Sequence, residues 1–422
     1  MREARRSSGM VWAKFAREAG FGEAYLRNVE NGNRTITLDV ATAYDRVLRT
    51  GGVFAATVEA TDTAAVANAP WDQGGTLAVV AELLDGSRVD RRGLLTAGIA
   101  LSASASNWSR ALESIGSQLA PGPLPEDPAA LRHIDKRLDY LRHLDDELGS
   151  GEVYTLARGE LLFAVTLIKS RRHTGTTLQH LYSLAAEAAR QVAWAAFDQD
   201  RFGVATRFFD ASLRASAEAG DSIAGAYTLS FAAIQCYSTP QQAGRAVSLL
   251  EAARTEVKGR GTPRMEAMLA ARTARALSKT GAKKECAHQL HLARAALDKG
   301  RREDDPRTLY WVDYGEIEMI AGSAALELSD PAEAVRRFEA AMQASYPGDE
   351  EYPRSHAIYL ARAAEAHLAM HDLDGAVATA HHAATCLGSV DSARSASELK
   401  GLREKLAAHT SHAGVREFLQ VG

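Results

Sequence analysis

Two groups of histidines and cysteines in this sequence have the spacing of potential metal ligands. Histidines four residues apart on one helix can share a metal ion, and a nearby thiolate can add a third ligand. The first group comprises His367, His371, His381, His382 and Cys386, and the second comprises Glu285, Cys286, His288 and His291. Cys286, however, falls on a position that the helical pattern assigns to the core, and the sequence has no Cys-x-x-Cys pair. We therefore expect no metal site and no cofactor.

Motifs that carry catalysis are missing from the sequence. It contains no glycine-rich phosphate loop, no Gly-x-Ser-x-Gly elbow and no paired carboxylates in a recognisable catalytic frame. We expect a protein that is not an enzyme, and the search for function moves to residues that could bind a partner.

Composition narrows the fold class. The chain has 422 residues, of which 46% are hydrophobic and 24% charged, so it can bury a core and is not a disordered chain. Alanine is abundant and aromatic residues make up only 7%, which favours closely packed helices. The three cysteines are too scattered for a disulfide framework. With no signal peptide and no apolar run of about 20 residues, we expect a cytoplasmic protein without a membrane span.

Charge is distributed unevenly along the chain. Residues 1–50 carry nine Lys and Arg against six Asp and Glu, a net charge of +3, whereas the whole chain carries −4. The remaining residues therefore have a net charge of −7. A small basic segment on a larger acidic body is compatible with a DNA-binding module attached to another domain.

The first fifty residues predict three short helices. Apolar residues at helical spacing cover 10–19 and stop at Gly20, a residue that favours helix C-termini. A second helix is expected over 23–30, with Leu26 and Val29 facing inward, and a third over 38–48. Only three residues separate the first two helices, so they must be joined by a tight turn.

This segment resembles the helix-turn-helix of the phage-repressor-like (Cro, XRE) family. The resemblance covers about residues 1–50 and is carried by Phe15-Ala16, by Ala19-Gly20-Phe21 in the turn, and by Tyr25-Leu26-Arg27-Asn28-Val29-Glu30-Asn31-Gly32. It implies that the second helix of the pair lies in the major groove of DNA. The positions it implies for DNA contact are Trp12, Lys14, Gly22, Glu23, Ala24, Tyr25, Arg27, Asn28 and Arg34.

Individual roles follow from side-chain chemistry. Asn28 can read an adenine edge, and Arg27 or Lys14 can hold phosphates. Trp12 stands where the family often has glutamine, and Glu23 would face phosphates unless it accepts a hydrogen bond from a cytosine amino group. These departures leave open a second interpretation, in which the protein is a repeat scaffold that binds a partner protein and its helix-turn-helix no longer grips DNA.

The sequence predicts three segments before the helical repeats. Residues 1–52 form the DNA-binding domain, and residues 53–105, rich in Ala, Thr and Gly at their start, are expected to be a linker with short helices. Residues 106–178 predict helical hairpins, with one apolar stripe formed by Leu131, Ile134, Leu138, Leu141 and Leu144.

Residues 179–391 repeat a pattern of paired helices. Each second helix carries a small, bulky, small triplet at i, i+4, i+7. The triplets are Ala205, Phe209 and Ser212-Leu213; Ala246, Leu250 and Ala253; Cys286, Leu290 and Ala293; Ala334, Phe338 and Ala341; and Ala376, Ala380 and Ala383. The repeats resemble tetratricopeptide repeats with lengthened helices, and 392–422 is expected to be a polar capping helix.

Stacked helical pairs curve into a superhelix whose concave wall presents the first helix of each pair. The residues expected there to bind a ligand are Arg190, Trp194, Tyr227, Gln235, Arg272, Arg275, Glu316 and Arg354. Arginines can hold a carboxylate and aromatic rings can stack. The alternative is that Trp194 and its neighbour Phe231 are ordinary inter-repeat core.

The sequence thus predicts an all-α protein with an N-terminal helix-turn-helix followed by a right-handed tetratricopeptide-like superhelix. The layout is similar to actinobacterial regulators of this kind and to the peptide-responsive Rgg, PlcR and Rap group. That resemblance implies a homodimeric transcriptional regulator that binds double-stranded DNA. It also implies a signalling peptide, a small molecule or a partner protein on the concave face.

Overall fold

The structure is a computed structural model that describes residues 1–31, 36, 38–48, 50, 54, 69–85, 94–116, 129–170, 173, 175–239, 241–344, 346–348, 351–388 and 390–420. Helices make up most of this part of the chain, and none of its residues belongs to a β-strand; one isolated bridge joins Gly149 to Asp391. The predicted all-α class is confirmed over the described residues. Within them, no helix combines the length and apolar character needed to cross a bilayer.

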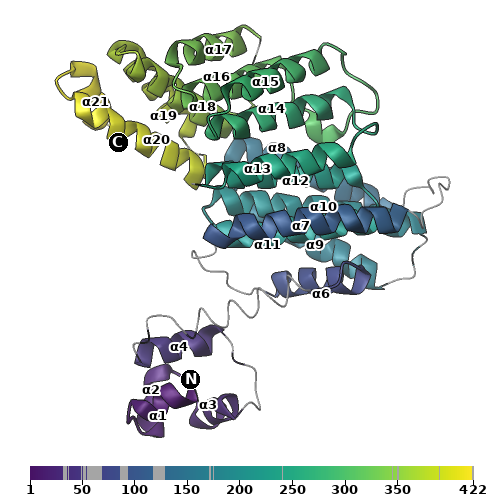
Figure 1. The fold of residues 1–422 in the computed structure, drawn as a ribbon. Helices are drawn as coiled ribbons and strands as arrows, with labels where there is room; N and C mark the ends of the chain where they lie inside the picture. Colours follow the sequence, from purple (N-terminus) through teal and green to yellow (C-terminus); the bar gives the residue numbers. More distant parts are fainter. Residues whose placement is uncertain are drawn as a thin grey trace. The chain divides into compact units, whose positions relative to one another are not determined.

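The chain forms two compact units, the first holding helices α1 to α4 and the second holding α6 to α21 (Figure 1). The helices of the first unit are α1 (Arg2–Ser7), α2 (Trp12–Ala19), α3 (Glu23–Glu30) and α4 (Leu38–Leu48). The last three coincide with the helices predicted over 10–19, 23–30 and 38–48, to within two residues at one end.

A tight turn joins α2 to α3. Gly20 adopts the left-handed conformation (φ 79°), and the N–H groups of Gly20 and Phe21 both donate to the carbonyl of Ala16. This pattern ends α2 and lets α3 begin after Gly22. The two helices then pack with α4 around a core that contains Phe15, Ala16, Ala19, Leu26, Val29, Val40, Ala43 and Tyr44.

The second unit is a stack of antiparallel helical hairpins (Figure 1). Its first four helices are α6 (Gln73–Leu84), α7 (Leu94–Gly116), α8 (Ala129–Leu148) and α9 (Gly151–Ser170). Five pairs follow: α10 (Gly175–Asp198) with α11 (Phe202–Ala219), α12 (Ser222–Ser238) with α13 (Ala243–Glu256), α14 (Pro263–Lys279) with α15 (Lys283–Leu297), α16 (Tyr314–Glu327) with α17 (Pro331–Gln343), and α18 (Pro353–Ala369) with α19 (Leu373–Leu387). The chain ends with α20 (Ala393–Leu406) and α21 (Ala413–Gln420).

The predicted triplets explain how each pair closes. All five lie on the second helix of a pair, and every member is buried except Leu290, which is partly buried. Small residues allow the two helices to approach, and in four of the five triplets a bulky middle residue fills the space between them, whereas the fifth has Ala380 there. The ring of Phe338 on α17 packs so closely on Gly322 of α16 that a Cβ there would lie 2.8 Å from it.

The segment before the repeats is more closely integrated than a linker. Helix α7 packs against α11, α12 and α13, so the predicted linker boundary at residue 105 falls inside a helix of the body. Four residues of the predicted stripe on α8 are buried, and Leu144 is partly buried. The apolar spacing of residues 131–144 therefore identified the packed face correctly.

Contacts also join the first hairpins of the array to its last helices. The N–H of Ser150, which follows α8, donates to the carbonyl of Asp391 (3.0 Å). The N–H of Asp391 in turn donates to the carbonyl of Leu148 (2.9 Å). Gly149 there has a positive φ (86°), and a Cβ would lie 2.4 Å from the Asp391 carbonyl oxygen, so both the backbone conformation and the close approach favour glycine. Helix α8 also packs against α18, so the stack encloses the space between its first helices.

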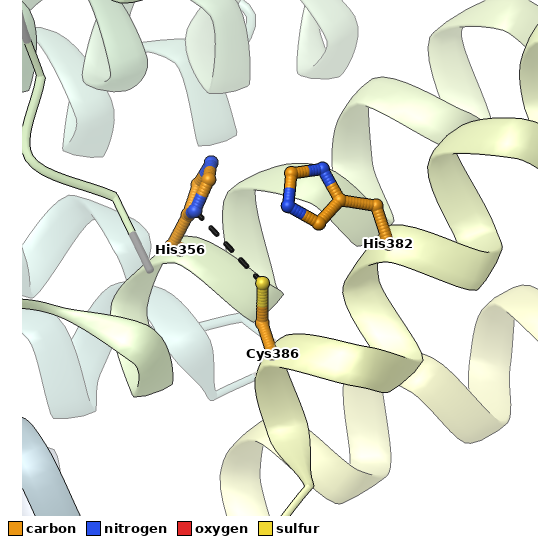
Figure 2. Close-up of side chains that lie close together, drawn as sticks. All are labelled: His356, His382 and Cys386. Carbon is orange, nitrogen blue, oxygen red and sulfur yellow. Dashed lines mark hydrogen bonds between the residues drawn. The ribbon is translucent and has the colours of Figure 1, made fainter. Parts of the chain in front are cut away.

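The hairpin α18–α19 brings together side chains that lie far apart in the sequence. His356 of α18 lies beside His382 and Cys386 of α19 (Figure 2). His382 and Cys386 belong to the group singled out from the sequence, whereas His356 does not.

Close helix packing gives a direct test of the fold at Gly225 of α12. A Cβ at this position would lie 2.2 Å from Cζ2 of Trp108, a fully buried residue of α7. We expect Gly225→Ala to lower the free energy of unfolding by about 1–3 kcal/mol, because α7 must shift to make room. Urea unfolding followed by circular dichroism measures the change.

The matched control is Gly159→Ala, on an exposed position of α9 where nothing lies within 4 Å of the new Cβ. This variant should be neutral or more stable by up to about 1 kcal/mol, because alanine favours the helix. Equal stability of the two variants would contradict the contact between α7 and α12.

Candidate ligand cavity and nucleic-acid interface

A cavity of about 120 Å³ lies between the first helices of the stacked pairs. Its wall is formed by α8, α10, α12, α14, α16 and α18, with contributions from α20 and from residues 310–311. Two kinds of side chain dominate it. The arginines are Arg142, Arg190, Arg272, Arg354, Arg362 and Arg394, and the aromatic residues include Trp194, Tyr227, Phe231, Tyr237, Tyr310, Trp311, Tyr346, Tyr352 and Tyr359.

Six of the eight residues predicted for the concave wall line this cavity: Arg190, Trp194, Tyr227, Arg272, Glu316 and Arg354. The other two do not. Gln235 points between helices, where its amide donates to the Thr206 hydroxyl (2.8 Å). Arg275 lies in a separate cleft and pairs with Glu327 (3.5 Å).

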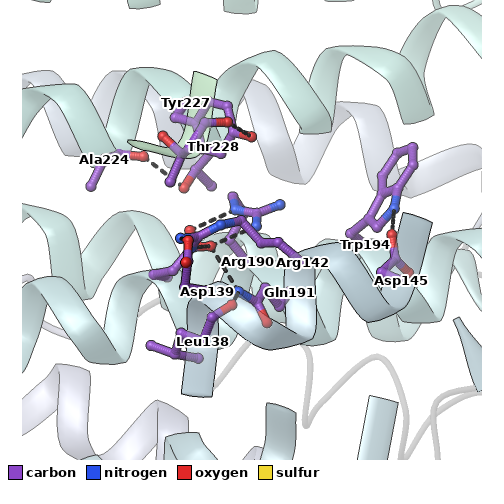
Figure 3. A network of polar contacts seen from close by, with 12 residues as sticks. Leu138, Asp139, Arg142, Asp145, Arg190, Gln191, Trp194, Ala224, Tyr227 and Thr228 are labelled. Carbon is purple, nitrogen blue, oxygen red and sulfur yellow. Dashed lines mark hydrogen bonds and ion pairs between the residues drawn. The ribbon is translucent and has the colours of Figure 1, made fainter. Parts of the chain in front are cut away.

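Most of the cavity arginines already have acidic partners. Glu187 of α10 accepts hydrogen bonds from Arg142 (2.8 Å), from Arg190 through two nitrogens (2.7 and 2.8 Å) and from Gln191 (2.9 Å). Figure 3 shows Arg142 and Arg190 converging from α8 and α10. Burial alone would raise the pKa of Glu187, but Arg190 and Arg142 outweigh it and hold the pKa at about 2. The carboxylate thus stays charged and fixes both guanidinium groups.

A second network joins α8, α10 and α18. The Trp194 indole N–H donates to Asp145 (2.9 Å), as Figure 3 shows, and Ser150 donates to the same carboxylate (2.6 Å). Arg354 of α18 also donates to Asp145. Trp194 is 7% exposed, so it belongs to the packed wall of the cavity.

Arg272 of α14 differs from the other cavity arginines. Among the described residues it forms no ion pair, and its Nε has no hydrogen-bond acceptor, although its side chain hydrogen-bonds with Tyr237 and Glu316 is close enough to interact with its charge. Its guanidinium group lies over the rings of Trp311 (5.0 Å) and Phe231 (5.4 Å). A planar cation stacked on rings, with no carboxylate in direct contact, is suited to binding a carboxylate or phosphate.

Two cavity carboxyl groups have raised pKa values and are about half protonated at pH 7. Burial raises the pKa of Asp146 to about 7, against the opposing effect of Arg354. Burial likewise raises the pKa of Glu316 to about 7, although the Tyr359 hydroxyl donates to it (2.6 Å) and Arg272 is nearby. Their protonation leaves the cavity with excess positive charge, so an anion that carries a flat ring matches its wall.

Several residues that line the cavity were not among those predicted from the sequence. Tyr310 donates to Asp146, and the Trp311 indole donates to the Tyr227 hydroxyl (3.2 Å). Both residues belong to the connection between α15 and α16, outside the helical pattern. The 48-residue spacing from Cys286 to Ala334, against 40–42 elsewhere, was the sequence signal of this insertion.

The N-terminal unit presents one face of α3 to solvent. Of the predicted DNA-binding residues, Lys14, Gly22, Ala24, Arg27 and Asn28 are exposed. Trp12, Glu23 and Tyr25 are partly exposed, and Arg34 lies outside the described residues. Leu26 and Val29 face the core, as predicted. The chain therefore offers a short helix whose outer side chains can contact a partner.

Contacts within the predicted DNA-binding face restrain two of its side chains, those of Arg27 and Trp12. The Arg27 guanidinium pairs with Glu23 one turn earlier (2.6 Å) and lies over the Trp12 ring (5.0 Å). Arg5 lies over the same ring (3.6 Å). The Trp12 ring is thus covered by the guanidinium groups of Arg5 and Arg27 and is only partly exposed.

The C-terminal end of α3 is fixed by a contact the sequence did not indicate. Glu30 accepts two hydrogen bonds from Arg5 (2.8 and 3.0 Å) and one from the Tyr44 hydroxyl (2.9 Å). These contacts join α1, α3 and α4, which fixes the orientation of α3 within its unit.

Comparisons with protein-family models, with curated proteins and with solved structures gave no significant match. The functional assignment therefore rests on the chemistry of the cavity and of the exposed face of α3.

Proposed function

We propose that this protein is a DNA-binding transcriptional regulator whose helical-repeat unit senses a small anionic ligand. The observation that carries the proposal is the exposed face of α3, which follows α2 after a tight turn and presents Ala24, Arg27 and Asn28 to solvent. In this proposal α3 enters the major groove, and Asn28 pairs with an adenine edge while Lys14 contacts a phosphate.

The proposed regulator acts as a cytoplasmic homodimer. A single N-terminal unit offers few phosphate contacts, and two units reading half-sites about one helical turn apart would double them. The stacked hairpins, in this proposal, are tetratricopeptide-like repeats wound into a right-handed superhelix around the cavity. Their packed triplets support this assignment.

The size and chemistry of the cavity favour a small molecule over a signalling peptide. Drug-sized ligands occupy pockets of roughly 300–1,000 Å³, and this cavity measures about 120 Å³. Ligand binding would alter the operator affinity only if it favours one arrangement of the hairpins, since a ligand shifts an equilibrium by its differential affinity.

The test on the DNA side is a gel-shift assay with the DNA upstream of the protein's own gene. We expect retardation that weakens steeply with salt, as phosphate contacts require. Asn28→Ala should lower specific affinity about 5- to 150-fold, because each bidentate base contact contributes roughly 1–3 kcal/mol.

The matched control is Ser7→Ala, an exposed change on α1 outside the predicted contact set, which should bind like the wild type. Circular dichroism shows whether each variant is folded. If Asn28→Ala binds specific DNA as tightly as the wild type, this assignment of α3 fails.

One observation favours the second candidate, a repeat scaffold that binds a partner protein. Because Glu23 neutralises Arg27 on the same helix, the face offers DNA less positive charge than its arginine suggests. The same gel shift separates the two candidates: no retardation of wild-type protein even at low salt would support the scaffold.

A further inference from the structure

Three potential metal ligands converge on the inner side of the α18–α19 hairpin. His356 lies on α18, and His382 and Cys386 lie one turn apart on α19. Their donor atoms all lie within 4.8 Å of one another, and the Cys386 sulfur is 4.0 Å from Nδ1 of His356. The centroids of the two imidazole rings are 5.4 Å apart and the rings are nearly perpendicular; Nδ1 of His356 is the ring nitrogen that faces the sulfur (Figure 2).

The burial of the three side chains differs in a way that suits a metal ion. His356 is 1% exposed and Cys386 is 8% exposed, whereas His382 is exposed. Two ligands are therefore fixed by packing, and the third closes the site from the solvent side. Gly348 packs closely against the His356 ring, since a Cβ at this position would lie 2.9 Å from Nδ1, and this contact helps to hold the imidazole beside Cys386.

We propose that His356, His382 and Cys386 bind a zinc ion. One thiolate and two imidazoles form a ligand set that zinc prefers, with bonds of about 2.3 Å to sulfur and 2.0–2.1 Å to nitrogen. In a tetrahedral site with such bonds the donor atoms lie about 3.3–3.6 Å apart, so Cys386 Sγ and His356 Nδ1, at 4.0 Å, need to approach by about 0.5 Å. The widest pair, up to 4.8 Å apart, needs to approach by about 1.3 Å, which rotation of the exposed His382 side chain can provide. Three protein ligands leave the fourth position to water or to another group.

Binding is an acid–base exchange without a redox step. As the sulfur–zinc bond forms, the Cys386 thiol gives its proton to solvent, and each neutral imidazole donates one nitrogen lone pair. The ion keeps its +2 charge, and the thiolate reduces the net charge of the site to +1. Zinc affinity therefore falls with falling pH.

The site goes beyond the proposed function and does not depend on DNA binding. A zinc ion would join α18 to α19 two residues after Arg354, which lines the ligand cavity. Metal occupancy would thus stabilise one wall of the cavity from behind.

The test is a titration of metal-free, full-length protein with Co²⁺, followed by absorption spectroscopy. We expect one Co²⁺ per chain, a thiolate-to-cobalt charge-transfer band, visible bands of tetrahedral intensity, and loss of both on adding Zn²⁺. Cys386→Ser should remove the charge-transfer band and lower the affinity at least about 10-fold. His382→Ala should also weaken binding at least about 10-fold.

Two matched controls change residues of the same types that are not among the proposed ligands. Cys286→Ser removes another buried thiol, on α15, and His381→Ala removes the neighbouring imidazole, which packs on Phe418 (5.0 Å). Both should bind Co²⁺ like the wild type. Wild-type protein that gives no charge-transfer band, or a Cys386→Ser variant that binds as tightly as the wild type, would overturn the proposal, and the wild-type measurement is independent of whether any variant folds.

Discussion

Glu187→Gln is expected to destabilise the second unit by about 3–5 kcal/mol. The side chain of Glu187 is only 15% exposed and is the shared partner of Arg142 and Arg190, whose side chains are 8% and 4% exposed. Removing its charge leaves the buried Arg190 without its paired carboxylate and leaves Arg142 with Asp139 alone, and an uncompensated buried charge is strongly destabilising. Urea unfolding followed by circular dichroism measures the loss.

The control is Glu160→Gln, which removes the partner of Arg137 in a pair whose arginine is 47% exposed. It should cost less than about 1 kcal/mol, as surface ion pairs do. The pKa of Glu187 is lowered to about 2, so its contribution to stability is present above the ordinary glutamate pKa and is lost as pH falls from there toward 2. A Glu187→Gln variant as stable as Glu160→Gln would refute the structural role of the buried network.

Arg272→Met is expected to weaken the binding of a small aromatic anion about 10- to 100-fold. Arg272 is the cavity arginine without an ion-pair partner among the described residues, and a hydrogen bond to a charged group contributes roughly 1.5–3 kcal/mol. A suitable probe is 4-hydroxybenzoate, and quenching of Trp194 and Trp311 fluorescence gives the affinity. Its neutral analogue, 4-hydroxybenzamide, should bind much more weakly.

The control is Arg275→Met on the same helix, whose guanidinium lies outside the cavity and should not affect the probe. If the neutral amide binds as tightly as the carboxylate, or if Arg275→Met weakens binding as much as Arg272→Met, the anion assignment is wrong.

The same probe should reveal the titration of the cavity carboxyl groups. As pH falls from 8 to 6, Glu316 and Asp146 gain protons around pH 7 and repulsion of the anion decreases, so wild-type affinity should rise. Glu316→Gln should bind more tightly at pH 8 and show a flatter profile. Because these pKa values are raised by folding, the two groups favour the folded state at low pH, and this contribution is lost as pH rises through 7.

Helical periodicity predicted much of the fold. The bounds of α2, α3 and α4, the stripe on α8 and the triplets of the paired helices all follow from apolar spacing, because each helix buries one face and spacing alone defines that face. Six of the eight expected wall residues line the cavity for the same reason.

Features that depend on contacts between distant segments could not be predicted in this way. Glu187 lies three residues from its partner Arg190, but its role in joining two hairpins depends on Arg142, which is 45 residues away. Tyr310 and Trp311 belong to an irregular connection, where no periodicity indicates direction. His356 and Cys386 are 30 residues apart, so only the packing of α18 on α19 reveals that they are neighbours.

The backbone bonds between Asp391 and the turn after α8 have a consequence for how the molecule loses its structure. An open solenoid frays from its termini, since each terminal repeat has a neighbour on one side only. Here the Ser150 amide and the Leu148 carbonyl hold Asp391, so the early and late hairpins shield one another. Amide hydrogens along this array should consequently exchange in one cooperative opening instead of progressively from either extremity.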